Sequence, residues 1–129
     1  MNGRYLLDTN VVIALFAGEP KVLERLKQAK EVFVPCIVLG ELYFGAYKSS
    51  SPEKNLARID EFAMNVSVLG CDIDTARVYG LIKQELKKKG RPIPENDLWI
   101  AAIARQYNLT LATRDIHFQE ISELLKEVW

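Results

Sequence analysis

Short apolar runs alternate with longer segments of helical periodicity along the 129-residue chain, and this alternation restricts the possible folds more than any other feature. Apolar runs predict strands at 5–7, 32–34, 66–69 and 109–113, and helical periodicity predicts helices at 11–17, 19–29, 37–47, 52–64, 74–89 and 96–107. Strands that alternate with helices pair in parallel through right-handed crossovers. The sequence therefore predicts an α/β fold of three layers, α/β/α, with a parallel sheet of four to five strands and helices on both faces.

Local signals set the expected helix boundaries. Asp74 is a suitable N-cap for the helix at 74–89, Gly90 would stop that helix, and Asn96 would cap the helix at 96–107. The two prolines within 91–94 predict an extended linker between these helices. After residue 118 the sequence fits either a last helix or a short edge strand.

We expect one domain over residues 1–129, because 49% of the residues are hydrophobic and no repeat or linker divides the chain. Lysine plus arginine and aspartate plus glutamate number 17 each, so any contact with nucleic acid requires a local patch. No apolar stretch is long enough for a signal sequence or a membrane span, which predicts a cytoplasmic protein without membrane contact. Cys36 and Cys71 lack metal-site spacing, which fits reduced thiols.

Four acidic residues stand where a simple solvent-exposed carboxylate is not expected. Asp8 follows the first strand and Asp115 follows the fourth, and ligands bind at the carboxyl ends of strands in open α/β sheets. Glu41 and Asp97 lie in helices and share a face with apolar residues three and four positions away. The pattern predicts that these acids are at least partly buried.

A buried carboxylate is costly unless a cation compensates its charge, and no lysine or arginine is obviously matched to these four. A divalent cation would compensate them, and oxygen ligands without cysteine or histidine favour Mg²⁺ or Mn²⁺ over zinc. Such a site suits phosphodiester hydrolysis, because metal ions activate water and stabilise charge on the attacking and leaving oxygens. Three of these acids also have structural explanations: Asp8 could form a turn, Asp97 could favour the first turn of a helix through the helix dipole, and Asp115 could be a loop residue. The hypothesis of a metal site therefore depends on the four acids together.

The same residues carry a resemblance to a known family. In order and spacing, four segments resemble the acidic motifs of PIN-domain nucleases: LLDTN at 6–10, GELYFGA at 40–46, PENDLWIAA at 94–102 and LATRDIHF at 111–118. The second and third segments are particularly similar to those of VapC-type toxins of type II toxin–antitoxin systems. The resemblance spans nearly the whole chain and is complete at the four acids.

This resemblance implies a PIN-like sheet of five strands and an Mg²⁺- or Mn²⁺-dependent endoribonuclease that hydrolyses RNA phosphodiester bonds. It also implies a homodimer and neutralisation by a cognate VapB-type antitoxin that reaches the acidic groove. The four acids would be the catalytic metal ligands. Asn10 and Thr113 would be polar neighbours that hold a water molecule or a carboxylate.

Basic residues could also contact RNA. Lys87, Lys88, Lys89 and Arg91 form the one dense basic run, a short way before the third acid, where they could guide a phosphate backbone. Lysines before a helix-ending glycine also interact well with the helix dipole, so a structural role is equally expected. Arg114 could pair with an acid or meet a phosphate.

The remaining conspicuous side chains are expected to be structural. His117 is the only histidine, and it is given no catalytic role. Core packing is favoured over a dimer interface for five aromatic residues, Tyr43, Phe44, Tyr47, Tyr79 and Trp99.

Two other classes of protein remain open. A receiver-like phosphorylatable signalling domain has a similar size, a parallel sheet and an acidic magnesium pocket. It would require adjacent acids after the first strand, a phosphoacceptor aspartate at the end of a central strand and a lysine near the last strand. The strands at 32–34 and 66–69 are instead followed by proline and glycine, so this class fits less well. A non-catalytic PIN-like binding module would share the scaffold, but the presence of all four acids argues against it.

Overall fold

Five parallel strands form one sheet in the structure, a computed structural model that describes residues 3–129. The strands are β1 (Arg4–Leu7), β2 (Glu31–Pro35), β3 (Ser67–Leu69), β4 (Thr110–Ala112) and β5 (Lys126–Glu127). Their order across the sheet is β3-β2-β1-β4-β5, and every neighbouring pair is parallel. The predicted α/β fold is confirmed, with five strands. The single domain over residues 1–129 stays a prediction, and residues 1 and 2 lie outside the described part.

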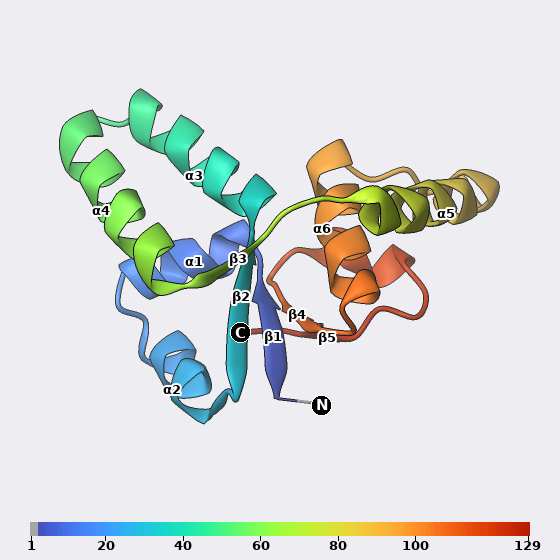
Figure 1. Ribbon diagram of the computed structural model, residues 1–129, viewed down its shortest axis with the longest axis horizontal. Helices are drawn as coiled ribbons and strands as arrows, with labels where there is room; N and C mark the ends of the chain where they lie inside the picture. The colour runs from blue at the N-terminus through green and yellow to red at the C-terminus, as the bar shows by residue number, and fades with distance from the viewer. Residues whose placement is uncertain (1–2) are drawn as a thin grey trace.

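Helices cover both faces of this sheet. α1 (Thr9–Phe16) and α2 (Pro20–Gln28) follow β1, whereas α3 (Cys36–Lys48) and α4 (Pro52–Asn65) follow β2. α5 (Ile73–Lys89) and α6 (Glu95–Gln106) follow β3, and a 3₁₀-helix (Ile116–Glu120) precedes β5. Figure 1 shows α1 to α4 on one side of the strands and the packed pair α5 and α6 on the other.

The direction of the connections explains this division. From β1 the chain moves through β2 to β3 at one edge, and it then returns across the sheet to β4 on the other side of β1. Right-handed crossovers that run in opposite directions place their helices on opposite faces. The reversal lies between β1 and β4, and the crevice outside the carboxyl ends of strands at such a point is the usual ligand site of open α/β folds.

The core is continuous from the central strands into α6. Leu6 and Leu7 of β1 and Leu111 of β4 are at most 1% exposed, and so is every residue from 100 to 104 in α6. Trp129 is also 1% exposed and packs on Tyr5 with a centroid separation of 4.8 Å. This burial holds the first turn of α6 and the segment after β4 against the central strands.

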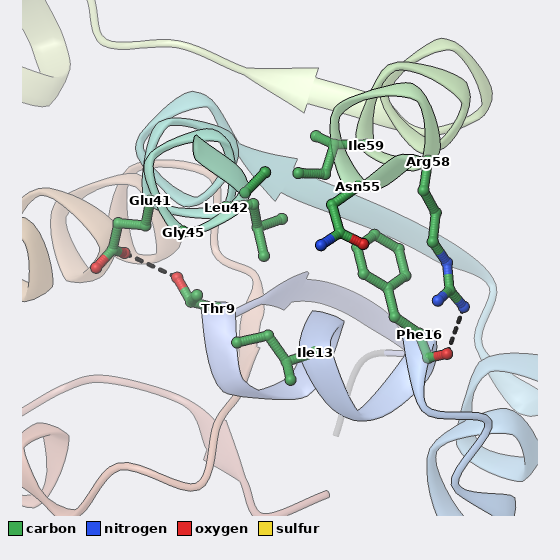
Figure 2. A pocket seen from close by; sticks show the side chains of 10 residues that line it. Thr9, Ile13, Phe16, Glu41, Leu42, Gly45, Asn55, Arg58 and Ile59 are labelled. Atoms are coloured by element: carbon green, nitrogen blue, oxygen red, sulfur yellow. Dashed lines mark hydrogen bonds between the residues drawn. The ribbon is translucent and has the colours of Figure 1, made fainter. Parts of the chain in front are cut away.

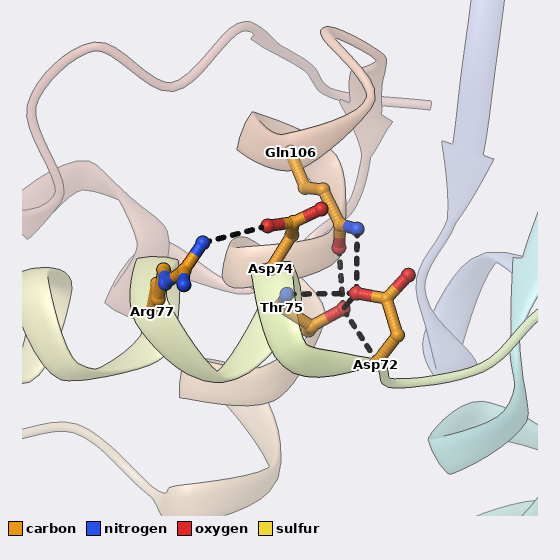
Figure 3. Close-up of polar contacts among 5 residues, drawn as sticks. All are labelled: Asp72, Asp74, Thr75, Arg77 and Gln106. Carbon is orange, nitrogen blue, oxygen red and sulfur yellow. Dashed lines mark hydrogen bonds and ion pairs between the residues drawn. The ribbon is translucent and has the colours of Figure 1, made fainter.

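The start of α5 differs from the prediction. Asp72, not Asp74, caps the helix: its Oδ1 accepts the Thr75 N–H at 3.0 Å, and the Thr75 hydroxyl accepts the Asp72 N–H at 3.0 Å. The Gln106 side-chain amide donates to the same Asp72 oxygen at 2.9 Å (Figure 3). The reciprocal pair makes a complete capping box, so position 72 satisfies more backbone groups than position 74 could.

Two further boundaries were predicted incompletely. α6 begins at Glu95 directly after Pro94, so the prediction of Asn96 as the cap is wrong. Pro94 takes the N-cap position with an extended ψ of 146°, so the first helical residue is the one after it. In the tail, the short edge strand forms as β5, preceded by the 3₁₀-helix.

The expected burial of the aromatic residues is wrong for two of the five. Phe44 and Tyr47 on α3 are 63% and 68% exposed, whereas Tyr43, Tyr79 and Trp99 are partly buried. Both cysteines are free and exposed thiols. No helix within residues 3–129 is both long and apolar enough to cross a membrane.

Candidate metal centre

Asp8 lies at the junction of β1 and α1 and is 4% exposed. Its N–H donates to the Ala112 carbonyl at 3.0 Å, which continues the pairing of β1 with β4 by one residue. One carboxylate oxygen accepts the Thr9 N–H at 2.8 Å and caps α1, and the other accepts the Thr113 hydroxyl at 2.6 Å. The Asp8 side chain is therefore held in one orientation at the reversal point of the sheet.

Glu41 reaches this region from the middle of α3, which packs against both α1 and α6. Its Oε1 accepts the Thr9 hydroxyl at 2.7 Å (Figure 2). Thr9 thus links the two acids, because its N–H binds Asp8 and its hydroxyl binds Glu41. Sequence reasoning missed this role, and the available signal was the position of Thr9 directly after the first acid.

Asp97 in the first turn of α6 and Asp115 after β4 lie on either side of His117. The His117 Nδ1 is 3.0 Å from Asp115 Oδ1 and 3.4 Å from Asp97 Oδ2. One ligand atom from each of the three residues lies within 4.8 Å of the others. The expectation that His117 has only a structural role is therefore incomplete, because its side chain lies beside two of the acids. Its position two residues after Asp115 could have indicated that it lies near that acid.

These groups line one open hollow of about 490 Å³ beside the first turn of α6. We call it the carboxylate hollow and define it by Glu41, Asp97, Asp115 and His117. Asp8 is nearly enclosed and does not line the hollow. Its charge nevertheless raises the pKa of Asp97, and the charges of Asp115 and Glu41 raise the pKa of Asp8. All four predicted acids therefore meet at the carboxyl edge of the sheet.

The acids perturb one another. The pKa of Asp97 is raised from its usual 3.8 to about 6 by burial first and then by the charges of Asp115 and Asp8, while His117 opposes the shift. Burial also raises the pKa of Asp8, and it outweighs the hydrogen bonds from Thr113 and Thr9, which act in the opposite direction. Within residues 3–129, no lysine or arginine forms an ion pair with any of the four acids.

The donor chemistry fits a hard divalent cation. Oxygen ligands from several carboxylates are what Mg²⁺ and Mn²⁺ prefer. His117 lies with Asp97 and Asp115, so the expectation of a cluster without histidine is wrong. A cation placed here would remove the mutual repulsion that raises the pKa of Asp97. Glu41, Asp97, Asp115 and Asp8 are thus the residues that could hold a metal, with His117 as an additional donor.

The other predicted site residues take different positions. Asn10 accepts the Arg114 N–H at 3.2 Å, and the Thr113 hydroxyl accepts the Asp115 N–H at 3.0 Å, so both hold the segment that carries Asp115. The Arg114 guanidinium binds Glu19 at 2.7 Å and donates to the Trp129 carbonyl at 2.6 Å.

The basic run lies outside the carboxylate hollow. Lys87, Lys88 and Lys89 end α5, and Arg91 lies in the linker to α6. All four are exposed, and none of them lines the hollow. Their contact with RNA stays a prediction.

The profile of the PIN domain family matches residues 5–124, and the chain belongs to this family. It is similar to the ribonuclease VapC2 of Haemophilus influenzae, with 40% identity over 129 residues and 98% of each chain covered. It is 37% identical over 130 residues to the tRNA(fMet)-specific endonuclease VapC of Shigella flexneri, again with 98% of each chain covered. These relatives confirm the resemblance to VapC ribonucleases and exclude the receiver-like domain.

The fold comparison agrees. The solved structure of VapBC-1 from nontypeable Haemophilus influenzae superposes with a TM-score of 0.89 and 36% sequence identity. The alignment covers 97% of each chain. The five-stranded sheet and its flanking helices are therefore those of VapC structures.

Proposed function

We propose that the chain is the toxin of a toxin–antitoxin pair, an Mg²⁺- or Mn²⁺-dependent endoribonuclease that cleaves RNA at the carboxylate hollow. The observation that supports this proposal is the meeting of Asp8, Glu41, Asp97 and Asp115 at the reversal point of the sheet. Within the described residues these acids lack a lysine or arginine ion pair. Such a cluster is stable only with protons or a cation to offset its charge.

The side chains of this site would have different roles in hydrolysis. A bound divalent cation would supply positive charge to the attacking water and the leaving oxygen. Asp8 is fixed by two donors and keeps its orientation throughout. Glu41 commits one oxygen to the Thr9 hydroxyl, which leaves the other available to accept a proton from water. His117 Nδ1 lies 3.0 Å from Asp115 Oδ1 and 3.4 Å from Asp97 Oδ2, so the imidazole would be a further donor to the cation.

RNA is the substrate that the ribonuclease relatives imply, and transfer RNA is the first RNA to test because one relative is named for tRNA(fMet). The test is digestion of total RNA and of purified tRNA(fMet) by the purified protein, with mapping of new ends by sequencing. Discrete cuts should appear with Mg²⁺ or Mn²⁺ and disappear in chelator. Cleavage that is unchanged by chelator would contradict the proposal. Binding without cleavage at any metal concentration would instead support the non-catalytic module.

Growth provides a cellular test of the toxin role. Expression without a partner protein should arrest growth, and Asp97→Asn should relieve the arrest because the site loses a ligand. Matched expression of both proteins is checked by immunoblot. An arrest that persists in the variant would indicate toxicity by binding rather than by hydrolysis.

The antitoxin would bind in an apolar groove that leads to the carboxylate hollow. The groove has a volume of about 350 Å³ and lies between α1, α3 and α4 (Figure 2). Its apolar lining consists of Ile13, Phe16, Leu42, Ala46 and Ile59. Glu41 and Thr9 stand at one end of the groove, and at the other Arg58 donates to the Phe16 carbonyl. A partner segment with an apolar stripe and a cation beside Glu41 would fit both features.

A matched pair of exposed isoleucines tests this groove. Ile13 is 55% exposed and lines the groove, whereas Ile73 is 74% exposed at the start of α5. Ile13→Asp should weaken antitoxin binding at least tenfold, and Ile73→Asp should not, as measured by calorimetry. Equal effects of the two substitutions would exclude the groove. The homodimer stays a prediction, which sedimentation equilibrium would test.

A further inference from the structure

A second hollow is lined in part by Gly90, Pro92 and Ile93 of the linker that joins α5 to α6. Figure 1 shows the course of this linker. We call it the linker hollow and define it by Lys83, Leu86, Lys87, Ile93, Glu95 and Leu98. Its volume is about 490 Å³, and Glu95 lines both hollows, so the two adjoin at the first turn of α6. A ligand that crosses Glu95 could therefore occupy both.

The wall of the linker hollow is apolar and its rim is basic. Leu86 and Leu98 are each 3% exposed, and the partly buried Ile93 packs against the same core. Lys83 and Lys87 are exposed and face solvent at the rim. A concave apolar surface of this size with a few placed polar groups is typical of a site for one small molecule or one side group of a polymer.

The charged side chains that line the linker hollow are Lys83, Lys87 and Glu95. Residues 83–95 contain five lysines or arginines and two glutamates, although the whole chain has a formal net charge of zero. Lys83 is paired with Glu95 at 3.0 Å, and Lys89 donates to the Glu120 carbonyl at 2.8 Å. Lys87 forms no ion pair with any residue from 3 to 129. Its ammonium group can therefore meet a ligand phosphate without breaking an existing pair.

We propose that the linker hollow binds one nucleotide of the RNA substrate next to the cleaved bond. The base would lie against Leu86, Ile93 and Leu98, and its phosphate would meet Lys87. Single-stranded RNA is recognised through bases that leave the stack and bury against protein side chains, while cationic groups hold the backbone. The inference rests on the proposed ribonuclease function. It adds a site that would recognise the nucleotide next to the cleaved bond of the RNA.

The direct test uses ribonucleoside 5′-monophosphates as probes. Each is titrated into isotopically labelled protein in chelator and followed by amide NMR, with inorganic phosphate as a separate arm. The amides of Lys87, Gly90 and Ile93 should shift and saturate at millimolar nucleotide. Lys87→Gln and Ile93→Ser should each weaken binding at least fivefold, and Lys54→Gln, an exposed lysine on α4, should not. Absence of these shifts, or equal shifts with inorganic phosphate alone, would overturn the base site.

Cleavage kinetics separate this inference from the proposed function. For a cleaved RNA, Lys87→Gln should raise KM at least fivefold with kcat nearly unchanged, because the hollow contributes binding away from the reacting bond. Nucleotide binding in chelator should survive Asp97→Asn. If no RNA is cleaved yet nucleotides still bind here, the ribonuclease proposal fails and the hollow remains a nucleotide site. If RNA is cleaved and Lys87→Gln lowers only kcat, the linker hollow is not a substrate site.

Discussion

Two aspartates at the starts of the packed helices α5 and α6 show how differently the same residue type can be used. Asp72 caps α5 and accepts hydrogen bonds from the Thr75 N–H and the Gln106 amide, and these bonds lower its pKa (Figure 3). Asp97 lies in the first turn of α6, where burial and neighbouring carboxylates raise its pKa to about 6. Within residues 3–129, the basic side chain that lies against it is His117, whose Nδ1 is 3.4 Å from Asp97 Oδ2.

The difference lies in what surrounds each carboxylate. Asp72 is exposed and its charge is satisfied by donors from its own helix and from α6. Asp97 is partly buried and faces three other acids. A carboxylate whose charge is stabilised by hydrogen bonds within the protein contributes to stability. A carboxylate without such compensation is stabilised by a bound cation or a proton. Four predictions test this distinction, from the largest expected effect to the smallest.

Loss of the charge at Asp97 should remove RNA cleavage. Asp8→Asn, Glu41→Gln and Asp97→Asn should each lower the rate at least on the order of 100-fold, because each removes a charge that acts on the reacting groups. Asp115→Asn should have a milder effect. Asp72→Asn is the matched control and should cleave at nearly the wild-type rate. The measurement is single-turnover cleavage of a mapped RNA. Comparable losses of the cleavage rate in Asp97→Asn and Asp72→Asn would contradict the distinction between these two aspartates.

Metal should stabilise the wild type more than the Asp97→Asn variant. A cation that binds only the folded protein raises the free energy of unfolding by about 2.7 kcal/mol at one hundred times its Kd. Thermal melts across an Mg²⁺ or Mn²⁺ titration measure this effect. Asp72→Asn should respond as the wild type does. Melting curves that do not move with metal would remove the basis for a metal site.

Without metal, Asp97→Asn should be more stable than the wild type by on the order of 1 kcal/mol, because the substitution relieves repulsion and burial of charge. The folded-state pKa of about 6 exceeds the ordinary 3.8, so the folded protein binds this proton more tightly than the unfolded chain does. The wild-type penalty is therefore full above about pH 6 and disappears as the pH falls towards 3.8. Urea unfolding of both proteins in chelator between these values measures the difference, and a gap that widens towards low pH would contradict the assignment.

Asp72→Ala should have the opposite sign and lower the melting temperature by a few degrees, since it leaves the first turn of α5 without its cap. The change should be the same in chelator and in metal. Thr75→Val, which removes the other half of the capping box, is the companion variant and should act in the same direction. A rise in melting temperature for Asp72→Ala would show that the charge of Asp72 destabilises the protein, as expected for Asp97, and would contradict its role as a stabilising cap.

The sheet and the placement of the four acids at its carboxyl edge could be predicted from the sequence, because both depend on local patterns. Apolar runs, helical spacing and the placement of Asp8 and Asp115 after strands are visible without a structure. The place of His117 two residues after Asp115 could have indicated that it lies near that acid, but its approach to Asp97 depends on how the 3₁₀-helix after β4 turns back towards α6. Periodicity also could not reveal that Phe44 and Tyr47 are exposed, since it marks an apolar face without showing what covers it.

The hydrogen bond from Thr113 to Asp8 joins residues 105 positions apart, and it has a consequence for the order in which the molecule is made. β1 is synthesised first but gains its second neighbour only when β4 has left the ribosome, because β4 pairs with the opposite side of β1 from β2. Domains generally fold as units during synthesis. Asp8 and Glu41 belong to the first part of the chain, where Thr9 joins them, but the site also includes Asp97 and Asp115. It can therefore be completed only after β4 and the segment that carries Asp115 have left the ribosome.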